Sequence, residues 1–195
     1  MNGEIINIYD FDGVLFKESR VVWDEVLENN CKRFQIEVEE IIRKGYFPNH
    51  LYETDGGKAL YDIYKNAYFS QRMSDENVDR LSDLNEGAVG LVLTYNPSRL
   101  SMMKLIGDSN IGRFFREIVI GNRSHGPLKK DFFKAMRFAA GPDVLINFYT
   151  DTFEDLLEAQ TSESNIVSYY ATHEEKVSEM ILGITTKERI MKPFF

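Results

Sequence analysis

The sequence predicts an α/β fold in which helices cover both faces of a parallel sheet, with a helical domain inserted after the first strand. From residue 87 onward, short apolar runs alternate with helical patterns, as they do in doubly wound parallel sheets. Residues 17–86 show helical patterns and no strand pattern. Because the strand before them needs sheet partners that come only later, we predict an α/β core domain at 1–16 and 87–195 and a helical domain at 17–86.

The first strand is a short apolar run that stops at two acidic residues. Ile8 and Tyr9 fit a buried strand, and Asp10, Asp12 and Gly13 follow it directly. Two carboxylates close together raise each other's pKa, and burying them costs solvation, so a strand gains no stability from ending this way. From this stretch alone two interpretations are open. One is an Asp-Gly turn after an edge strand, and the other is a pair of acids at the carboxyl edge of the sheet, where α/β folds bind ligands.

The inserted domain is predicted to consist of helices. Apolar residues recur at helical spacing in each of its segments, and turn-forming residues separate the second segment from the third. An aromatic stripe in the third segment has two interpretations, a packed domain core or a surface that stacks on a base or sugar. The stripe consists of Tyr61, Tyr64, Tyr68 and Phe69. We predict helices over 20–34, 36–44, 60–68 and 78–84, and a loop over 46–57.

The core domain continues with four more strands, each followed by a helical pattern. Residues 89–94 form a near-continuous apolar run, as expected of a parallel strand buried on both faces. Asn96 is expected to be the N-cap of the next helix, with Pro97 at its first position. We assign no secondary structure to residues 185–195. The predicted strands span 89–94, 117–120, 144–149 and 165–170, and the predicted helices span 98–106, 127–140, 155–160 and 174–182.

Composition narrows the classes of protein to consider. Hydrophobic residues make up 43% of the 195 positions, which is typical of globular proteins. The formal net charge of −8 argues against broad nucleic-acid binding, which needs a basic surface. Cys31 is the single cysteine, so an intramolecular disulfide is excluded. The sequence shows neither a signal peptide nor a run of membrane-spanning length, so we expect a cytoplasmic protein without membrane association.

Polar side chains recur where the later predicted strands end. Each has an ordinary interpretation by itself, as a strand-end threonine, a solvated lysine or a helix-capping acid. The carboxyl ends of parallel strands meet at one edge of the sheet, so their occurrence together and in order favours a shared site. They are Thr94 after the second strand, Lys129 and Lys130 at the start of the helix after the third, and Asp151 and Asp155 after the fourth.

These residues resemble the four motifs of the haloacid dehalogenase (HAD) superfamily of phosphotransferases. Those motifs are an Asp-x-Asp after the first strand, a Thr or Ser after the second, a Lys near a helix start, and paired acids after the fourth strand. The resemblance covers 2–16 and roughly 87–182, and it implies a Rossmann-like core with 17–86 in the position of a mobile cap. Here the motifs stand as Asp10-Phe11-Asp12-Gly13-Val14-Leu15, Val92-Leu93-Thr94-Tyr95-Asn96, Lys129-Lys130 and Asp151-Thr152-Phe153-Glu154-Asp155.

The resemblance implies a role for each acid. Asp10 would be the nucleophile that forms an aspartyl-phosphate, and Asp12 would protonate the leaving oxygen and then activate water. Dehalogenases of the superfamily lack the second acid, so Asp12 points to phosphoryl transfer. The implied cofactor is Mg²⁺, held by Asp10, the backbone carbonyl of Asp12 and Asp151, with Asp155 either bound to the metal or beside it.

The resemblance also implies which groups hold the phosphoryl oxygens. Tyr95 departs from the family pattern, which often has a small residue at that position. One of the two adjacent lysines should point inward, and Lys129 is favoured because Lys130 is better placed to pair with solvent-facing acids. The implied phosphate-binding groups are the Thr94 hydroxyl, the N–H groups of Tyr95 and Asn96, and Lys129 or Lys130.

The predicted activity is Mg²⁺-dependent hydrolysis of a small phosphorylated metabolite. A phosphomutase and a nucleotide-specific phosphatase of the same superfamily are alternatives, because the inserted domain sets substrate access and its sequence does not identify a substrate. A non-catalytic binding module is an alternative from a different class, because fold alone does not establish catalysis. Nothing in the sequence indicates an oligomeric state.

Overall fold

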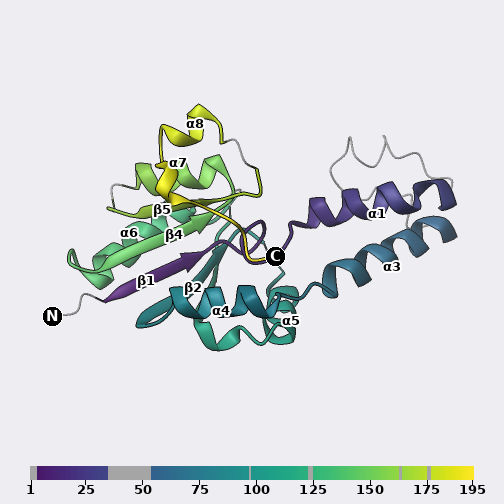
Figure 1. Ribbon diagram of the computed structural model, residues 1–195, viewed down its shortest axis with the longest axis horizontal. Coiled ribbons are helices and arrows are strands. Elements are labelled where there is room, and N and C mark those ends of the chain that lie inside the picture. The colour runs from purple at the N-terminus through teal and green to yellow at the C-terminus, as the bar shows by residue number, and fades with distance from the viewer. Residues whose placement is uncertain (1–3, 35–53, 97, 123–124, 163, 175–176) are drawn as a thin grey trace. The chain divides into compact units, whose positions relative to one another are not determined.

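The computed structural model divides the chain into two compact units (Figure 1). One unit is formed by 17–71, and the other by 1–16 together with 72–195. The predicted helix over 36–44 and most of the predicted loop over 46–57 lie outside the described residues. The structure describes residues 4–34, 54–96, 98–122, 125–162, 164–174 and 177–195.

The larger unit is built on a parallel sheet, which confirms the predicted α/β fold class. Its strands are β1 (Ile5–Tyr9), β2 (Ala88–Thr94), β3 (Phe115–Ile120), β4 (Leu145–Thr150), β5 (Val167–Ala171) and β6 (Ile190–Met191). In the described part of the chain they are ordered β3-β2-β1-β4-β5-β6. β1 is therefore central, and its register places Tyr9 opposite Val92 on one side and Tyr149 on the other.

Helices connect the strands of this unit. None of the helices that the structure describes is long and apolar enough to cross a membrane. The helices of this larger unit are α4 (Asp75–Leu84), α5 (Arg99–Asp108), α6 (Lys129–Ala140), α7 (Phe153–Thr161) and α8 (Glu179–Leu182), with 3₁₀ turns η2 (Gly112–Phe114) and η3 (Lys187–Arg189).

Several predicted helix starts were wrong. A helix of the smaller unit, α3 (Asp55–Phe69), begins at Asp55 and not at residue 60, so the end of the loop predicted over 46–57 is helical. The N-cap position of α5 is Ser98, because Asn96 uses its side-chain oxygen to accept a hydrogen bond from the Ser98 N–H at 2.9 Å and so forms a turn ahead of the helix. α8 begins at Glu179, after an N-cap at Ser178, and not at Glu174. Pro97 lies outside the described residues.

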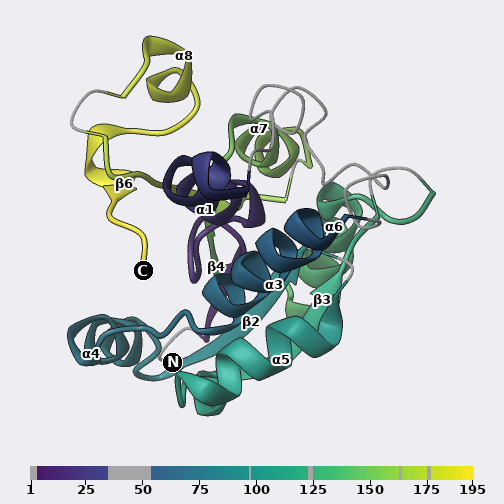
Figure 2. The same ribbon diagram turned by 90° about the vertical axis from the view of Figure 1, so that its right-hand side faces the viewer.

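One face of the sheet carries the apolar core. Side chains alternate along a strand, so Ile8, Leu91 and Phe148 project from the same face in the observed register. Phe133 from α6 and Ala159 from α7 pack against them. Helices α6 and α7 lie together on this side of the sheet (Figure 2).

Helix α4 packs on the opposite face of the sheet. Asn7 projects from that face, and its side-chain amide donates to the Leu84 carbonyl at 2.6 Å. Asn85, which caps the end of α4, donates to the Tyr9 hydroxyl at 3.0 Å. The two compact units divide after Gln71, so α4 belongs with the sheet, whereas we had predicted that the inserted domain extends to residue 86.

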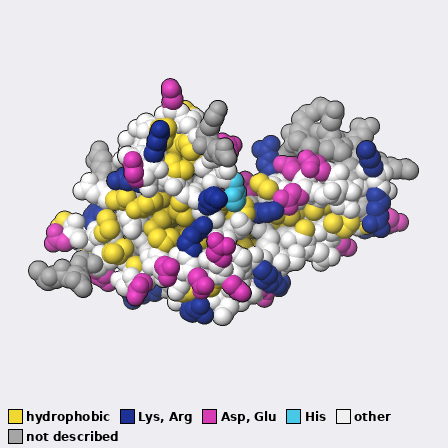
Figure 3. Space-filling model, viewed as in Figure 1, with side chains coloured by type: hydrophobic (Ala, Val, Ile, Leu, Met, Phe, Trp, Pro, Cys, Tyr) yellow, Lys and Arg dark blue, Asp and Glu magenta, His cyan; other side chains and the backbone are white. Residues whose placement is uncertain are grey.

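Three tyrosines form a ladder across this second face. Tyr9 stacks on Tyr149 with ring centroids 4.7 Å apart, and Tyr149 stacks on Tyr169 at 4.8 Å. Burial raises the pKa of Tyr9 and of Tyr149, so both phenols stay neutral and act as packing groups. Figure 3 shows hydrophobic side chains gathered on this unit between the positions of α4 and α8.

The smaller unit contains α1 (Ser19–Phe34) and α3 (Asp55–Phe69). Thr54 caps α3 by accepting a hydrogen bond from the Gly57 N–H at 3.0 Å. Trp23 of α1 stacks on Tyr64 of α3, with centroids 4.1 Å apart and an interplanar angle of 6°. The Tyr64 hydroxyl also lies 2.6 Å from the Ser19 hydroxyl. Tyr64 thus packs helix against helix, as the core interpretation of the aromatic stripe requires.

Candidate active site

The central strand and its neighbours bring the predicted site residues to one edge of the sheet. β1, β2 and β4 run parallel, and the residue after each strand or at its end is one of the predicted polar residues. Asp10 follows β1, Thr94 ends β2 and Asp151 follows β4. The Asp10 N–H donates to the Tyr149 carbonyl at 2.9 Å, which extends the β1–β4 pairing as far as the first acid.

A buried ion cluster connects Asp10 to the helices behind the sheet. Lys129 Nζ donates to Asp10 Oδ2 at 2.6 Å and also contacts Asp155 Oδ2. Only 6% of Asp10 and 1% each of Lys129 and Asp155 is exposed. Buried charges are stable only when they are paired, and here one ammonium faces two carboxylates. Lys129 is therefore the charge partner of both buried acids.

The start of α6 decides which of the two lysines enters this cluster. The Asp131 carboxylate accepts the Leu128 N–H at 3.0 Å, which closes the first turn of the helix. The Lys129 N–H donates to the Tyr95 hydroxyl at 2.8 Å, and Lys129 Nζ lies 5.0 Å from the centre of the Tyr95 ring. Lys130 is half-buried. The structure thus places Lys129 against Asp10, as favoured from the sequence.

Burial dominates the electrostatics of this cluster. It raises the pKa of the Asp10 carboxyl to about 7, an effect that Lys129 opposes and Asp155 reinforces. Burial lowers the pKa of Lys129, but the Asp10 and Asp155 carboxylates outweigh it, so the net pKa of Lys129 is raised. Lys129 therefore stays charged. A second cation placed beside Asp10 would favour the ionised form of the Asp10 carboxyl.

Asp12 lies in a second group of polar residues, formed with the end of β2. Its Oδ2 accepts a hydrogen bond from the Asn96 side-chain amide at 2.9 Å. The Asn96 N–H donates to Thr94 Oγ1 at 3.0 Å. Thr94 is almost fully buried, whereas Asp12 is partly exposed. A general acid needs this combination of a fixed position and access to the leaving group.

Asp151 lies directly against the loop that follows β1. Gly13 has a φ of +78°, and a Cβ built there would lie 1.8 Å from Asp151 Oδ2 and 2.1 Å from its Cγ. The carboxylate therefore occupies the space in which any larger residue would place its side chain. Asp10 and Asp12 thus belong to the segment that contains Gly13, and Asp151 lies against it.

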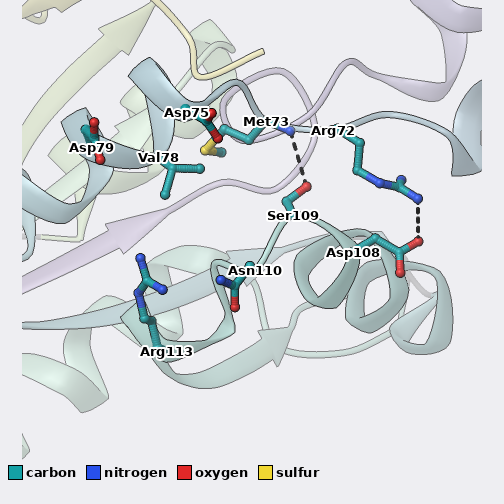
Figure 4. A pocket seen from close by; sticks show the side chains of 9 residues that line it. All are labelled: Arg72, Met73, Asp75, Val78, Asp79, Asp108, Ser109, Asn110 and Arg113. Carbon is teal, nitrogen blue, oxygen red and sulfur yellow. Dashed lines mark hydrogen bonds and ion pairs between the residues drawn. The ribbon is translucent and has the colours of Figure 1, made fainter.

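A cavity of about 490 Å³ elsewhere in the same unit is not suited to the predicted chemistry (Figure 4). It is formed by α4, the end of α5 and η2, and none of the predicted site residues lines it. Three aspartates line it, and Arg72 is ion-paired with Asp108 at 2.9 Å. With Arg113 also in the lining, three aspartates face two arginines, so the cavity offers no net positive charge for a phosphate group, and we place the site at the edge of the sheet.

Comparison with known proteins supports this fold through structure and not through sequence. No protein-family model matches the chain, and no curated protein sequence matches it. A protein from Thermotoga maritima assigned as a β-phosphoglucomutase has a TM-score of 0.66 and 14% identity, covering 97% of this chain and 94% of its own. A haloacid dehalogenase-like hydrolase from Streptococcus pneumoniae has a TM-score of 0.60 and 17% identity, covering 98% and 95%. A dehalogenase has a TM-score of 0.65 and 13% identity, covering 98% and 94%. This chain has the HAD fold.

Tyr95, which departs from the pattern of the HAD motifs, has a partner that the sequence did not reveal. Its hydroxyl donates to the Glu158 carboxylate at 2.8–2.9 Å and accepts the Lys129 N–H. Burial raises the pKa of Tyr95 to about 12, so the hydroxyl keeps the proton that it donates. Glu158 also accepts the Lys130 N–H at 3.2 Å. The only sign of this partner in the sequence was that Tyr95, a large polar residue, stands where the family often has a small one.

The carboxylates at this edge fit the Mg²⁺ that the HAD motifs imply. Among the described residues, no three His, Cys, Asp or Glu side chains gather in a group that could hold a metal ion. Mg²⁺ does not need one, because it usually binds one or two carboxylates and retains several waters. Asp10 and Asp151 follow adjacent paired strands and offer the hard oxygen ligands that this ion prefers. Asp155 is held by Lys129, which favours a place beside the metal over direct ligation.

Replacing Gly13 by Ala is expected to weaken Mg²⁺ binding at least about tenfold, because the new methyl group displaces Asp151. Gly87→Ala is the matched control. Gly87 has a φ of +72°, but nothing lies within 4 Å of its Cβ position. Gly87→Ala should lose about 1–2 kcal/mol of unfolding free energy from left-handed backbone strain, and Gly13→Ala should lose more because its methyl group also collides with Asp151. Urea unfolding and calorimetric Mg²⁺ titration check this, and equal Mg²⁺ affinity in both variants would contradict it.

Proposed function

We propose that this chain is a Mg²⁺-dependent phosphomonoesterase of the HAD superfamily that acts on a small phosphorylated metabolite. The observation that carries the proposal is the buried contact of Lys129 with both Asp10 and Asp155, at the sheet edge where Thr94 also ends its strand. Burying a lysine between two carboxylates costs solvation free energy, which favours a functional role for its charge. A phosphoryl group bound at Asp10 would interact with that charge.

In the proposed reaction the Asp10 carboxylate attacks phosphorus. An aspartyl-phosphate bond forms and the bond from phosphorus to the ester oxygen breaks, while Asp12 gives its proton to that leaving oxygen. Asp12 then takes a proton from water, whose oxygen attacks the same phosphorus. The bond to Asp10 breaks, which releases inorganic phosphate and restores both acids. The hydrogen bond from Asn96 to Asp12 orients the acid for both proton transfers.

The phosphoryl oxygens would be held by Thr94 and Lys129, whereas the Asn96 N–H, which the HAD resemblance implied as a further donor, is bonded to Thr94. Lys129 Nζ has three N–H donors and uses two of them on Asp10 and Asp155, so the third can reach a phosphoryl oxygen. The Thr94 hydroxyl oxygen accepts the Asn96 N–H at 3.0 Å, so the hydroxyl proton can be donated to a phosphoryl oxygen. Mg²⁺ at Asp10 and Asp151 would supply charge that neutralises the phosphoryl group.

Two findings support Mg²⁺-dependent phosphoryl transfer over dehalogenation. A HAD-type hydrolase from Bacillus subtilis with a TM-score of 0.60 and 12% identity was determined bound to magnesium. Asp12 is present and hydrogen-bonded, although the dehalogenase chemistry of the superfamily has no need of a second acid. Structures of similar fold nevertheless include both a mutase and a dehalogenase, so the assay must separate all three activities.

The test is a panel of phosphorylated metabolites, including sugar phosphates and nucleotides, together with p-nitrophenyl phosphate and a 2-haloacid. We expect release of inorganic phosphate with Mg²⁺ and its loss after chelation. Isomerised sugar phosphate without free phosphate would indicate a mutase, and halide release would indicate a dehalogenase. Binding of a phosphate analogue without turnover of any compound would indicate a non-catalytic module, and metal-independent turnover would exclude the proposed mechanism.

A further inference from the structure

The loop that follows β1, which we call the β1 loop (residues 10–16), is held from two sides. Inside the loop, the Leu15 and Phe16 N–H groups donate to the Phe11 carbonyl at 3.2 and 3.1 Å, and the Gly13 N–H donates to the Phe16 carbonyl at 2.7 Å. A backbone tie from outside the loop comes from the segment 190–195. The Phe194 N–H donates to the Val14 carbonyl at 2.8 Å.

Phe194 is anchored strongly enough to serve as this tie. Its side chain is fully buried, and its ring meets the ring of Tyr9 edge to face at 6.1 Å. The Arg80 guanidinium lies 4.2 Å from the centre of the Phe194 ring. Arg80 also donates to the carbonyls of Lys192 and Pro193, each at 2.8 Å. The segment is thus held both by α4 and by the central strand.

The two acids of the β1 loop depend on this tie to different degrees. Asp10 is held by the strand ladder, because its N–H bonds to β4. Asp12 lies beyond the ladder, two residues before Val14. The Asn96 amide holds its carboxylate, whereas its backbone position depends on how the loop is closed. Loosening Val14 should therefore displace Asp12 while leaving Asp10 in place.

We propose that Phe194 is a positioning residue for Asp12, acting through the Val14 carbonyl. This inference rests on the proposed function, in which Asp12 is the general acid. Loss of the tie would then impair proton donation to the leaving group more than attack by Asp10. An ester with a poor leaving group needs that proton, whereas p-nitrophenolate leaves without it.

The experiment compares kcat/KM for p-nitrophenyl phosphate and for an alkyl phosphate such as 2-phenylethyl phosphate in Phe194→Ala. We expect a loss of about tenfold or more for the alkyl ester and of less than about threefold for the aryl ester. Amide hydrogen exchange at Gly13 and Phe16 should also become faster, because both amides close the β1 loop. Phe194→Leu, which keeps an apolar anchor, should restore most of both properties.

Phe195→Ala is the matched control, because the neighbouring phenylalanine packs on His173 at 5.3 Å and not on the β1 loop. It should change neither the ratio of the two kcat/KM values nor the exchange rates. Arg80→Met is a second variant in case Phe194→Ala does not fold, and it should show the same selective loss. Equal losses for both esters, or unchanged exchange at Gly13 and Phe16, would overturn the inference.

The failure of the proposed function can be told apart from the failure of this inference. If the unaltered protein hydrolyses neither these esters nor any compound of the metabolite panel, the proposed function is rejected, and the exchange rates still decide whether Phe194 holds the β1 loop. If both esters are hydrolysed and Phe194→Ala matches Phe195→Ala in every measurement, the function stands and the positioning role is rejected.

Discussion

Replacing Asp10 by Asn is expected to lower the rate of phosphate-ester hydrolysis by about 10⁴-fold or more, because the amide cannot form the phosphoryl-enzyme intermediate. The substitution should preserve the fold. An Asn side chain keeps the oxygen that accepts the Phe11 N–H at 2.8 Å, and Lys129 keeps its contact with Asp155. The measurements are kcat in steady-state assays with Mg²⁺ and the mass of the protein trapped by acid during turnover.

The control for this prediction is Asp143→Asn, the same chemical change at an exposed position. It should leave kcat unchanged within about twofold, since surface substitutions away from a site have small effects. The trapped unaltered protein should carry one added phosphoryl group, and the Asp10→Asn protein should carry none. Turnover of the Asp10→Asn protein at the unaltered rate would exclude Asp10 as the nucleophile.

Replacing Lys129 by Met is expected to cost about 3–5 kcal/mol of unfolding free energy, the usual result of removing one partner of a buried ion pair. Met fills similar space, so the loss comes from charge and not from a cavity. The Asp10 and Asp155 carboxylates would then face each other without the ammonium that separates them. Urea unfolding measures the loss, and phosphatase activity should fall with it because the phosphoryl group loses a cation.

Lys130→Met is the matched control, because the same change one residue later affects a half-buried side chain. Its cost should stay within about 0.5 kcal/mol. Adding Asp155→Asn to Lys129→Met should recover part of the lost stability, since one of the two facing charges is removed. If Lys129→Met and Lys130→Met are equally stable, the ion cluster does not contribute to the fold as the structure indicates.

The sequence was most informative where chemistry and periodicity coincide. Asp10 and Thr94 stand at the ends of apolar runs, and parallel strands bring such ends together whatever the details of packing. The choice between Lys129 and Lys130 was harder, because adjacent helical residues point about 100° apart and the sequence does not set the helix phase. The structure sets that phase through Asp131 and Tyr95.

Contacts between distant segments could not be predicted from local patterns. β6 contains only two residues, too few to show a period, yet it carries the segment whose Phe194 reaches the β1 loop. The apolar side of α4 looked the same whether it packed on inserted helices or on the sheet. In the sequence Glu158 is an ordinary acidic residue on a helix, and only the structure shows that it accepts a hydrogen bond from Tyr95.

The central place of β1 has a consequence for the synthesis of the protein. Its partners on either side are Ala88–Thr94 and Leu145–Thr150, so β1 is made before both partners and must wait for Thr150 before it is paired on both edges. At translation rates of about 5–20 residues per second, that wait is on the order of 10 s. During this time at least one edge of the apolar strand is unpaired and exposes a template for aggregation. The strand that carries Asp10 therefore completes its pairing long after it is made.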